Sequence, residues 1–210
     1  MNNHQFENYI AAHTSPVGEA LDEIYRKTWL TTIYPRQLSG PLQGKFLEMI
    51  SRMIQPEKIL EIGTFTAYSA ICLAKGLKSG GQLTTIEADE ELEEVINENI
   101  KLAGEQDRIK LLTGDAIDLI PSLPDTYDLI FLDANKLAYP EYYPLLRERM
   151  EPNGFMLVDN VLWNNKVIQP EITDADTNAI RRFNQLVAQD PMVEQVLLPL
   201  RDGLMLIRRI

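Results

Sequence analysis

Apolar positions follow two different patterns along the chain, and the change between them falls near residue 55. Before it, apolar residues recur at three- and four-residue steps, as at Leu21 and Ile24, which predicts only helices over residues 1–55. After it, short apolar runs alternate with amphipathic stretches. The runs predict strands and the stretches between them predict helices. The predicted strands are 59–62, 83–87, 109–112, 129–133 and 155–159, and the predicted helices are 68–77, 90–103, 116–123 and 139–150.

Strands that are apolar on both faces and separated by helices indicate a parallel sheet with right-handed crossovers. The expected fold class is therefore α/β, with a doubly wound sheet. The C-terminal part departs from this pattern, because a helix near 176–189 is followed by two apolar runs, 193–200 and 204–210. The Asp202-Gly203 step between these runs predicts an antiparallel hairpin.

Composition narrows the classes of partner. A length of 210 residues with 45% hydrophobic content and no linker rich in Pro, Gly or Ser predicts a single domain over 1–210. The net charge of −11 argues against nucleic-acid binding. No apolar run approaches the roughly 20 residues that span a bilayer, and no leader pattern is visible, so we expect a cytoplasmic protein that binds a small molecule or a metal ion.

The first candidate site follows the strand 59–62, where residues 61–69 read EIGTFTAYS. Gly63 allows a tight turn, and Thr64 and Ser69 offer hydroxyls and amides at a helix start. The loop lacks the second and third glycines of the dinucleotide fingerprint, and no GK[ST] motif follows it. These absences favour a ligand that carries no phosphate.

Further polar residues close the next two strands. Glu87 ends the strand 83–87, where a carboxylate can accept the hydroxyls of a ribose or can simply be a solvated acid. Gly114, Asp115 and Ala116 join a strand to a helix. Asp115 can lie near an adenine edge, can cap the helix, or can do both.

Asp133 closes a later strand, and the pair Asp159-Asn160 closes the strand after it. Strand ends of a parallel sheet meet at one edge, so these three side chains can provide hard oxygen ligands for Mg²⁺, Ca²⁺ or Mn²⁺. Three protein ligands would leave coordination positions open, as in catalytic sites. The alternative is that the acids are unconnected caps.

Four segments together carry a family resemblance: EIGTFTAYS, TTIEAD, LIFLDANKLAYPEYY and LVDNVLW. In this order and spacing they resemble the cation-dependent O-methyltransferases, which include the catechol and caffeoyl-CoA enzymes. The resemblance covers nearly the whole chain. It implies a seven-stranded Rossmann-like methyltransferase sheet that binds S-adenosylmethionine, N-terminal helices that cover the active site, and a homodimer.

The resemblance also implies roles for individual residues. Lys136 matches the general base of the catechol enzymes, and we expect a neighbouring cation to lower its pKa. Tyr139 and Trp163 are candidates for contacts with an aromatic substrate. The metal ligands would be Asp133, Asp159 and Asn160. The residues expected to bind the cofactor are Glu61, Gly63, Thr64, Ser69, Glu87, Ala88, Gly114, Asp115, Ala116 and Asp133.

The expected function is divalent-metal-dependent methyl transfer from S-adenosylmethionine to a hydroxyl of a small catechol-like or caffeoyl-type aromatic compound. Two alternatives remain: a metal-independent transferase acting on a small molecule or on nitrogen, and an NAD-dependent oxidoreductase, against which the missing glycines argue. Gln37, Ala67 and Asn135 depart from the family pattern, which leaves the acceptor open.

Overall fold

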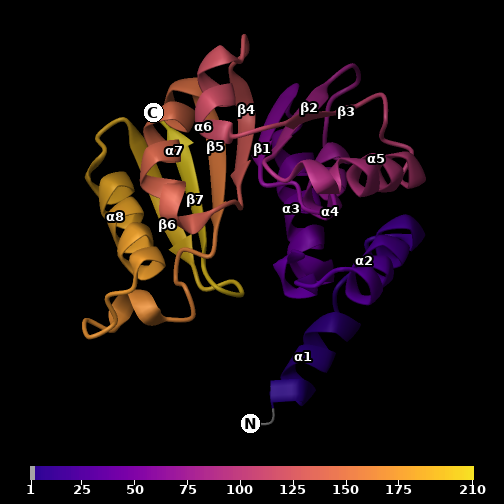
Figure 1. The fold of residues 1–210 in the computed structure, drawn as a ribbon, viewed down its shortest axis with the longest axis horizontal. Coiled ribbons are helices and arrows are strands. Elements are labelled where there is room, and N and C mark those ends of the chain that lie inside the picture. The colour runs from indigo at the N-terminus through magenta and orange to yellow at the C-terminus, as the bar shows by residue number, and fades with distance from the viewer. Residues whose placement is uncertain (1–2) are drawn as a thin grey trace.

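The computed structural model describes residues 3–210, so residues 1 and 2 of the expected N-terminal extension lie outside the described residues (Figure 1). Seven strands form one sheet in the order β3-β2-β1-β4-β5-β7-β6. β1 to β5 are parallel, and β7 runs antiparallel to both β5 and β6. The doubly wound α/β sheet and the C-terminal hairpin are thus confirmed. The strands are β1 (Lys58–Ile62), β2 (Gln82–Glu87), β3 (Ile109–Thr113), β4 (Tyr127–Leu132), β5 (Met150–Asp159), β6 (Val193–Leu198) and β7 (Leu204–Arg209).

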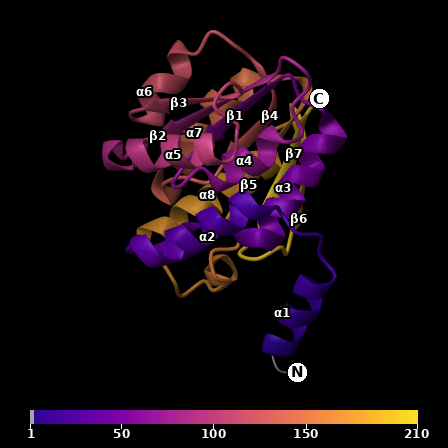
Figure 2. The same ribbon diagram turned by 90° about the vertical axis from the view of Figure 1, so that its right-hand side faces the viewer.

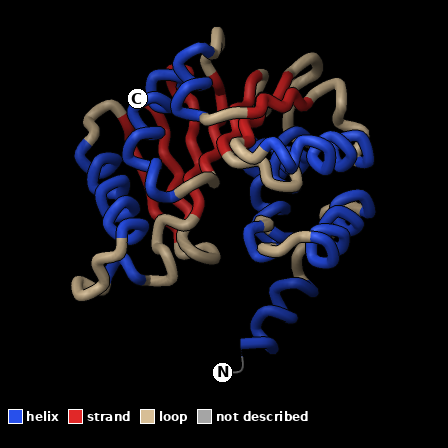
Figure 3. The backbone as a smooth tube through the Cα atoms, in the orientation of Figure 1, coloured by secondary structure: helices blue, strands red, loops and turns tan. Residues whose placement is uncertain are grey.

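Helices cover both faces of the sheet (Figures 1 and 3). The longer ones are α1 (Asn3–Ala12), α2 (Glu19–Thr31), α3 (Gly40–Ile54), α4 (Tyr68–Ala74), α5 (Glu93–Leu102), α6 (Ala116–Leu119), α7 (Tyr139–Arg149) and α8 (Ala175–Gln189). Short 3₁₀ helices are η1 (Pro35–Gln37), η2 (Glu90–Leu92), η3 (Ile120–Ser122), η4 (Lys136–Ala138) and η5 (Lys166–Ile168). Among the described helices, none combines the length and the apolar character that a membrane span requires.

Two separate cores result from the alternation of side chains along each strand. Leu60 and Ile62 of β1 join the core under α6, α7 and α8. Ile59 joins the core under α2, α3, α4 and α5. Glu61 is the next residue on that second face, and it is fully buried. The helix α1 stands out from the layers in two perpendicular views (Figures 1 and 2).

Several element boundaries differ from the predicted ones, and three of these differences have a clear structural reason. The predicted helix 116–123 is an α-helix only to Leu119, because Pro121 lacks the amide that would continue it. The predicted strand 155–159 begins earlier, since Met150 already pairs with Tyr127 of β4. The predicted helix 68–77 ends at Ala74, just before Gly76.

The topology places the site. The chain leaves β1 towards β2 on one side and later returns to place β4 on the other, so β1 and β4 flank the switch point of the sheet. Ligands of open α/β sheets bind outside the carboxyl ends of the strands at such a point. The loops after β1, β2, β4 and β5 all begin at this edge.

Candidate functional site

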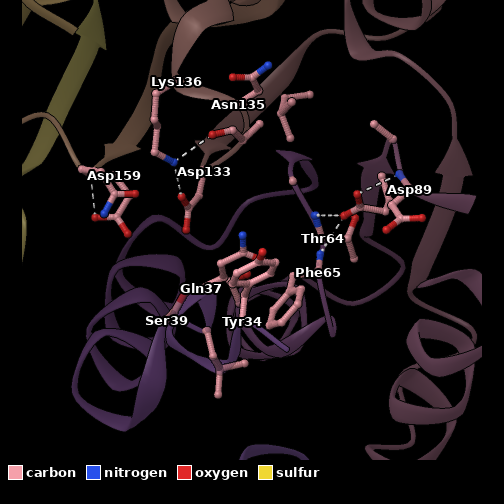
Figure 4. A pocket seen from close by; sticks show the side chains of 18 of the residues that line it. Tyr34, Gln37, Ser39, Thr64, Phe65, Asp89, Asp133, Asn135, Lys136 and Asp159 are labelled. Carbon is pink, nitrogen blue, oxygen red and sulfur yellow. Dashed lines mark hydrogen bonds and ion pairs between the residues drawn. The ribbon is translucent and has the colours of Figure 1, made fainter. Parts of the chain in front are cut away.

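A cavity of about 860 Å³ lies over the carboxyl edge of the sheet. Its walls come from the loops after β1, β2, β4 and β5, and from residues 33–39 between α2 and α3. Figure 4 shows Tyr34 and Gln37 of this N-terminal segment facing the strand ends. Of the N-terminal extension that was expected to cover the site, residues 33–39 line the cavity, whereas α1 contributes no lining residue.

The loop after β1 is shaped by backbone conformations that glycine favours. Gly63 has a φ of +91°, and a Cβ built on it would lie 2.1 Å from the carbonyl oxygen of Asp133. Glycine is therefore required here because the ends of β1 and β4 approach closely, and not only for the approach of a ligand. Phe65 and Ala67 also have positive φ values, of +51° and +63°. Glycine adopts the left-handed conformation of Ala67 at a lower energetic cost than alanine does.

Glu87 holds the same loop in place. Its Oε2 accepts hydrogen bonds from the amides of Thr64, at 3.0 Å, and Phe65, at 2.8 Å. Its Oε1 accepts one from the amide of Asp89, at 3.0 Å. The reading of Glu87 as a merely solvated acid is wrong, because the carboxylate organises two loops. Asp89 also lines the cavity and was missed by the sequence analysis, although it closes the TTIEAD segment.

Most of the residues expected to bind the cofactor line this cavity: Gly63, Thr64, Ser69, Glu87, Ala88, Gly114, Ala116 and Asp133. Two others do not. Glu61 lies beneath the loop and accepts a hydrogen bond from the Thr85 hydroxyl at 2.6 Å. Asp115 caps α6 through the amide of Ile117, at 2.9 Å, which confirms the capping interpretation.

The electrostatics of Glu61 are unusual for a carboxyl group. Burial raises its pKa to about 8, and the negative charges of Asp133 and Glu87 add to the rise, while hydrogen bonds from hydroxyl groups oppose it. Within the described residues, its Oε1 has no hydrogen-bond partner. This oxygen therefore has an unused position for accepting a hydrogen bond.

Asp133 and Lys136 form an ion pair at the end of β4, with 2.8 Å between Oδ1 and Nζ. Nζ of Lys136 also donates to the carbonyl oxygen of Ala134, at 2.8 Å, and lies 5.0 Å from the centre of the Tyr139 ring. Burial alone lowers the pKa of Lys136, but Tyr139 and Asp133 raise it more, so this pKa lies above its usual value. The expected lowering therefore does not occur while Lys136 is paired with Asp133.

Asp159 is buried at the end of β5, and each of its oxygens accepts one hydrogen bond. Oδ2 accepts from Nε2 of Gln43, at 2.8 Å, and Oδ1 accepts from the amide of Asn160, at 2.8 Å. Burial raises the pKa of Asp159 to about 6, and the charge of Asp133 adds to the rise, while the bonds from Gln43 and Asn160 oppose it. Asn160 has a φ of +62°, a conformation that asparagine tolerates better than most residues.

Asp133, Asp159 and Asn160 all line this cavity, so the structure brings together the three residues expected to bind a metal ion. Figure 4 shows Asp133 and Asp159 on the same side of it. Among residues 3–210, no group of three or more His, Cys, Asp or Glu side chains is arranged to hold an ion. The predicted set has only two carboxylates, and its third member is a carboxamide.

The prediction that Tyr139 contacts the substrate is wrong. Its side chain is fully buried, and its hydroxyl donates to the carbonyl oxygen of Asp159, at 3.2 Å. Its ring packs edge-on against Phe183, with 5.5 Å between the centres. Tyr139 therefore stabilises the end of β5 from within the core. Tyr142, also on α7, lines the cavity.

Trp163 lines the cavity as predicted. Its φ is +49°, and the two asparagines that follow have φ values of +52° and +59°, so the loop after β5 contains three successive left-handed residues. The C-terminal hairpin holds this loop, because the amide of Leu162 donates to the carbonyl oxygen of Asp202, at 2.9 Å. Within the described part of the chain, the buried Nε1 of Trp163 has no acceptor.

Comparisons with known proteins agree with the motifs. The profile of the O-methyltransferase family matches residues 11–210. The chain is 34% identical over 163 residues to a catechol O-methyltransferase of Niastella koreensis, a match that spans 76% of this chain and 74% of that protein. It is 30% identical over 193 residues to a caffeoyl-CoA O-methyltransferase of Stellaria longipes, covering 86% and 80% of the two chains.

Solved structures share the fold. The O-methyltransferase TomG from Streptomyces achromogenes, which is involved in tomaymycin synthesis and was solved in complex with SAM, has a TM-score of 0.92 to this structure at 29% sequence identity. That match covers 100% of this chain and 99% of TomG. The seven-stranded sheet expected from the motifs is therefore also the sheet of TomG.

Proposed function

Because this chain belongs to the O-methyltransferase family, we propose that it transfers the methyl group of S-adenosylmethionine to a hydroxyl of a small catechol-like or caffeoyl-type aromatic compound, with the help of a divalent cation. One observation carries the proposal. A single cavity is lined by the loop after β1 and also by the three oxygen-bearing side chains after β4 and β5. A methyl donor and an acceptor can thus be held side by side, and fixed orientation of two reactants contributes strongly to rate.

The first half of the cavity fits the cofactor. A carboxylate oxygen has about two acceptor positions, and Oε1 of Glu87 uses one of them for Asp89, so the other can receive a ribose hydroxyl. Ala88, Gly114 and Ala116 are small residues beside which an adenine ring can lie. When bound, S-adenosylmethionine supplies an electrophilic methyl group.

The second half of the cavity fits a hard divalent cation. Asp133 and Asp159 are close enough that the charge of one raises the pKa of the other, an arrangement that a shared cation stabilises. Two carboxylates and the Asn160 carboxamide suit Mg²⁺, and also Ca²⁺ or Mn²⁺. When bound, the cation supplies stabilisation of the deprotonated acceptor hydroxyl, whose pKa is otherwise about 10 for a phenol.

Lys136 would accept the proton of that hydroxyl. Its ammonium form is stabilised by Asp133, and Asp133 also belongs to the set of proposed cation ligands. When Asp133 serves as a ligand, its pairing with Lys136 weakens, and the amine loses its proton more readily. Asp133 would in this way couple the binding of the cation to the availability of the base.

The acceptor would lie between Trp163 and the N-terminal segment that contains Tyr34 and Gln37, since all three residues line the cavity. The rings of Trp163 and Tyr34 provide aromatic walls that fit a planar ring. These residues support an aromatic acceptor, whereas the comparisons name enzymes for both catechol and caffeoyl-CoA.

Metal-independent transfer is the second candidate function, and one contact favours it. The ion pair between Lys136 and Asp133 already provides a positive charge beside the strand ends. Such a charge could stabilise an acceptor anion without an ion. Dependence of the rate on a divalent cation separates the two functions.

The test is a screen of catechols and caffeoyl thioesters with labelled cofactor, run with Mg²⁺ and with excess EDTA. We expect EDTA or Asp159→Ala to lower the transfer rate by roughly 10³-fold or more, and cofactor affinity to change little. Asp118→Ala, at an exposed position outside the cavity, is the matched control. Full activity in excess EDTA would establish metal-independent transfer instead.

The proposal includes a homodimer. Leu30 and Ile33, at the end of α2 and just after it, are 74% and 87% exposed, and Phe6 and Tyr9 on α1 are also exposed. A group of exposed apolar side chains on neighbouring N-terminal helices is typical of an interface between protein subunits. Sedimentation velocity should give twice the mass of 24.0 kDa, and Leu30→Glu should yield the monomer.

A further inference from the structure

Asp159 is the end of a hydrogen-bonded chain of side chains that begins in the C-terminal hairpin. Arg201, in the turn between β6 and β7, donates through Nη1 to Oε1 of Gln43 on α3. Nε2 of Gln43 in turn donates to Oδ2 of Asp159, at 2.8 Å. Three segments that are distant in sequence thus meet at one carboxylate.

The donors and acceptors in this series of hydrogen bonds allow only one orientation of the Gln43 amide. A guanidinium can only donate and an ionised carboxylate can only accept, so the Gln43 amide must direct its oxygen to Arg201 and its nitrogen to Asp159. Gln43 is buried, so water does not offer alternative partners. Arg201 therefore fixes the orientation of Gln43, and Gln43 fixes that of the carboxylate.

The hydrogen bonds leave Asp159 able to bind an ion. Oδ2 accepts from Gln43 and Oδ1 accepts from the amide of Asn160, so each oxygen has used only one of its two acceptor positions. The carboxylate is held on both sides, with the remaining lone pairs free. Carboxylates that bind metals are commonly oriented by hydrogen bonds of this type.

Arg201 also connects this series of hydrogen bonds to the wall of the cavity. Its guanidinium donates to the carbonyl oxygens of Leu38 and Ser39, at the end of the segment 33–39 that lines the cavity. Its backbone has a φ of +51°, which the tight hairpin turn imposes. The position of this N-terminal wall and the orientation of Asp159 thus depend on the same side chain.

We propose that Gln43 and Arg201 are positioning residues for the cation site, which hold the Asp159 carboxylate in the orientation that binds a divalent ion. This inference rests on the proposed cation dependence. Gln43 acts on Asp159 through a direct hydrogen bond. Arg201, which also lines the cavity, acts through Gln43 and through its own positive charge.

The experiment measures Mn²⁺ binding to the purified full-length protein by calorimetry and by electron paramagnetic resonance. Gln43→Met keeps the length of the side chain and removes both polar ends. It should weaken Mn²⁺ binding about 10- to 100-fold. S-Adenosylmethionine affinity should change less than about threefold, because the cofactor half of the cavity has its own hydrogen bonds. Gln82→Met, at an exposed position at the start of β2, is the matched control and should bind Mn²⁺ normally.

Arg201→Gln provides a second variant, since Arg201 is exposed and its replacement disturbs packing less. It should weaken Mn²⁺ binding roughly threefold to tenfold. In the double variant the two effects should add only in part, because Arg201 loses its hydrogen-bonded route to Asp159 once Gln43 is gone and keeps only the direct interaction of its charge with that carboxylate. Transfer by either variant should recover at high Mn²⁺ concentration, which a general loss of folding would not allow.

Two results would overturn this inference and leave the proposed cation dependence intact. One is Mn²⁺ affinity in Gln43→Met equal to that of the unaltered protein while Asp159→Ala no longer binds the ion. The other is an equal loss of Mn²⁺ affinity, cofactor affinity and melting temperature in Gln43→Met, together with unchanged Mn²⁺ binding in Arg201→Gln. If the unaltered protein binds no Mn²⁺, the proposed cation dependence fails first, and the inference fails with it.

Discussion

The two halves of the cavity stabilise carboxylates by different means. At the end of β2, Glu87 accepts three hydrogen bonds, all from backbone amides of neighbouring loops. At the ends of β4 and β5, Asp133 and Asp159 rely on side chains, namely Lys136 and Gln43. Within residues 3–210, only one backbone amide, that of the residue after Asp159, contributes there.

Backbone amides are fixed by the fold, whereas side-chain donors can change partners. The half around Glu87 is therefore formed before a ligand arrives, and it suits a cofactor that is always the same. The half around Asp133 and Asp159 holds two acids together. Burial raises the pKa of Asp159 to about 6, and the charge of Asp133 adds to the rise. In a site of this kind, binding of a cation, a proton or an acceptor can change the partners of the side chains.

Replacement of Lys136 should have the largest effect. Lys136→Met removes the proposed base, so the transfer rate should fall about 10²- to 10⁴-fold, with cofactor affinity nearly unchanged. The dependence of the rate on pH should also lose the limb that reports deprotonation of this lysine. Turnover measured across a pH series checks both effects. Lys166→Met is the control, because Lys166 lies near Trp163 but is not paired with a strand-end acid. Equal pH profiles for the two variants would remove Lys136 from the mechanism.

Glu87→Gln tests the half that is built from backbone donors. A carboxamide cannot accept at both ends, so the loop after β1 loses at least one charge-assisted hydrogen bond, each of which is worth about 1.5–3 kcal/mol. We expect the Kd for S-adenosylmethionine to rise roughly 10- to 100-fold, while kcat at saturating cofactor stays within a factor of a few. Titration calorimetry and steady-state kinetics separate these quantities. Glu94→Gln, an exposed acid on α5, is the control. A fall in kcat with unchanged Kd would reverse the roles of the halves.

Trp163→Ala should have a smaller effect, confined to the acceptor. Loss of one aromatic wall should raise KM for a catechol about tenfold and leave the cofactor Kd unchanged. Trp29→Ala alters the other tryptophan, which does not line this cavity. A rise in the cofactor Kd for Trp163→Ala, with KM for the acceptor unchanged, would place the indole against the cofactor instead.

The fold and the strand-end residues were predictable because their signals are local. Apolar runs followed by polar residues locate strand ends, and all strand ends of a parallel sheet share one edge. Asp133, Asp159 and Asn160 accordingly line one cavity as expected. The hairpin was predictable for the same reason, from Asp202-Gly203 between two apolar runs.

The supporting residues were not predictable, because their signals are not local. Gln43 is 116 residues from Asp159, and nothing in the periodicity of α3 shows which polar residue turns inward. Tyr139 was wrongly expected at the substrate because closeness in sequence to Asp133 does not reveal which face of α7 packs on the core. The departure at Ala67 could be interpreted only once its φ of +63° was known.

Glu61→Gln should give the smallest effect, visible only in stability. The pKa of Glu61 is raised from a usual value of 4.5 to about 8 in the folded protein, so the folded state binds this proton more tightly than the unfolded state. The stability contributed by the group is fully present below pH 4.5 and is lost as the pH rises towards 8. A glutamine has no proton to lose, and its carbonyl can still accept from Thr85. Between pH 5 and pH 8 the melting temperature of the ligand-free variant should therefore rise relative to that of the unaltered protein, by roughly 10 °C. Scanning calorimetry of both proteins, with exposed Glu57→Gln as the control, measures this difference. A constant difference across that range would mean that Glu61 is ionised throughout, and that the half of the cavity built on backbone donors holds a buried charge as the other half does.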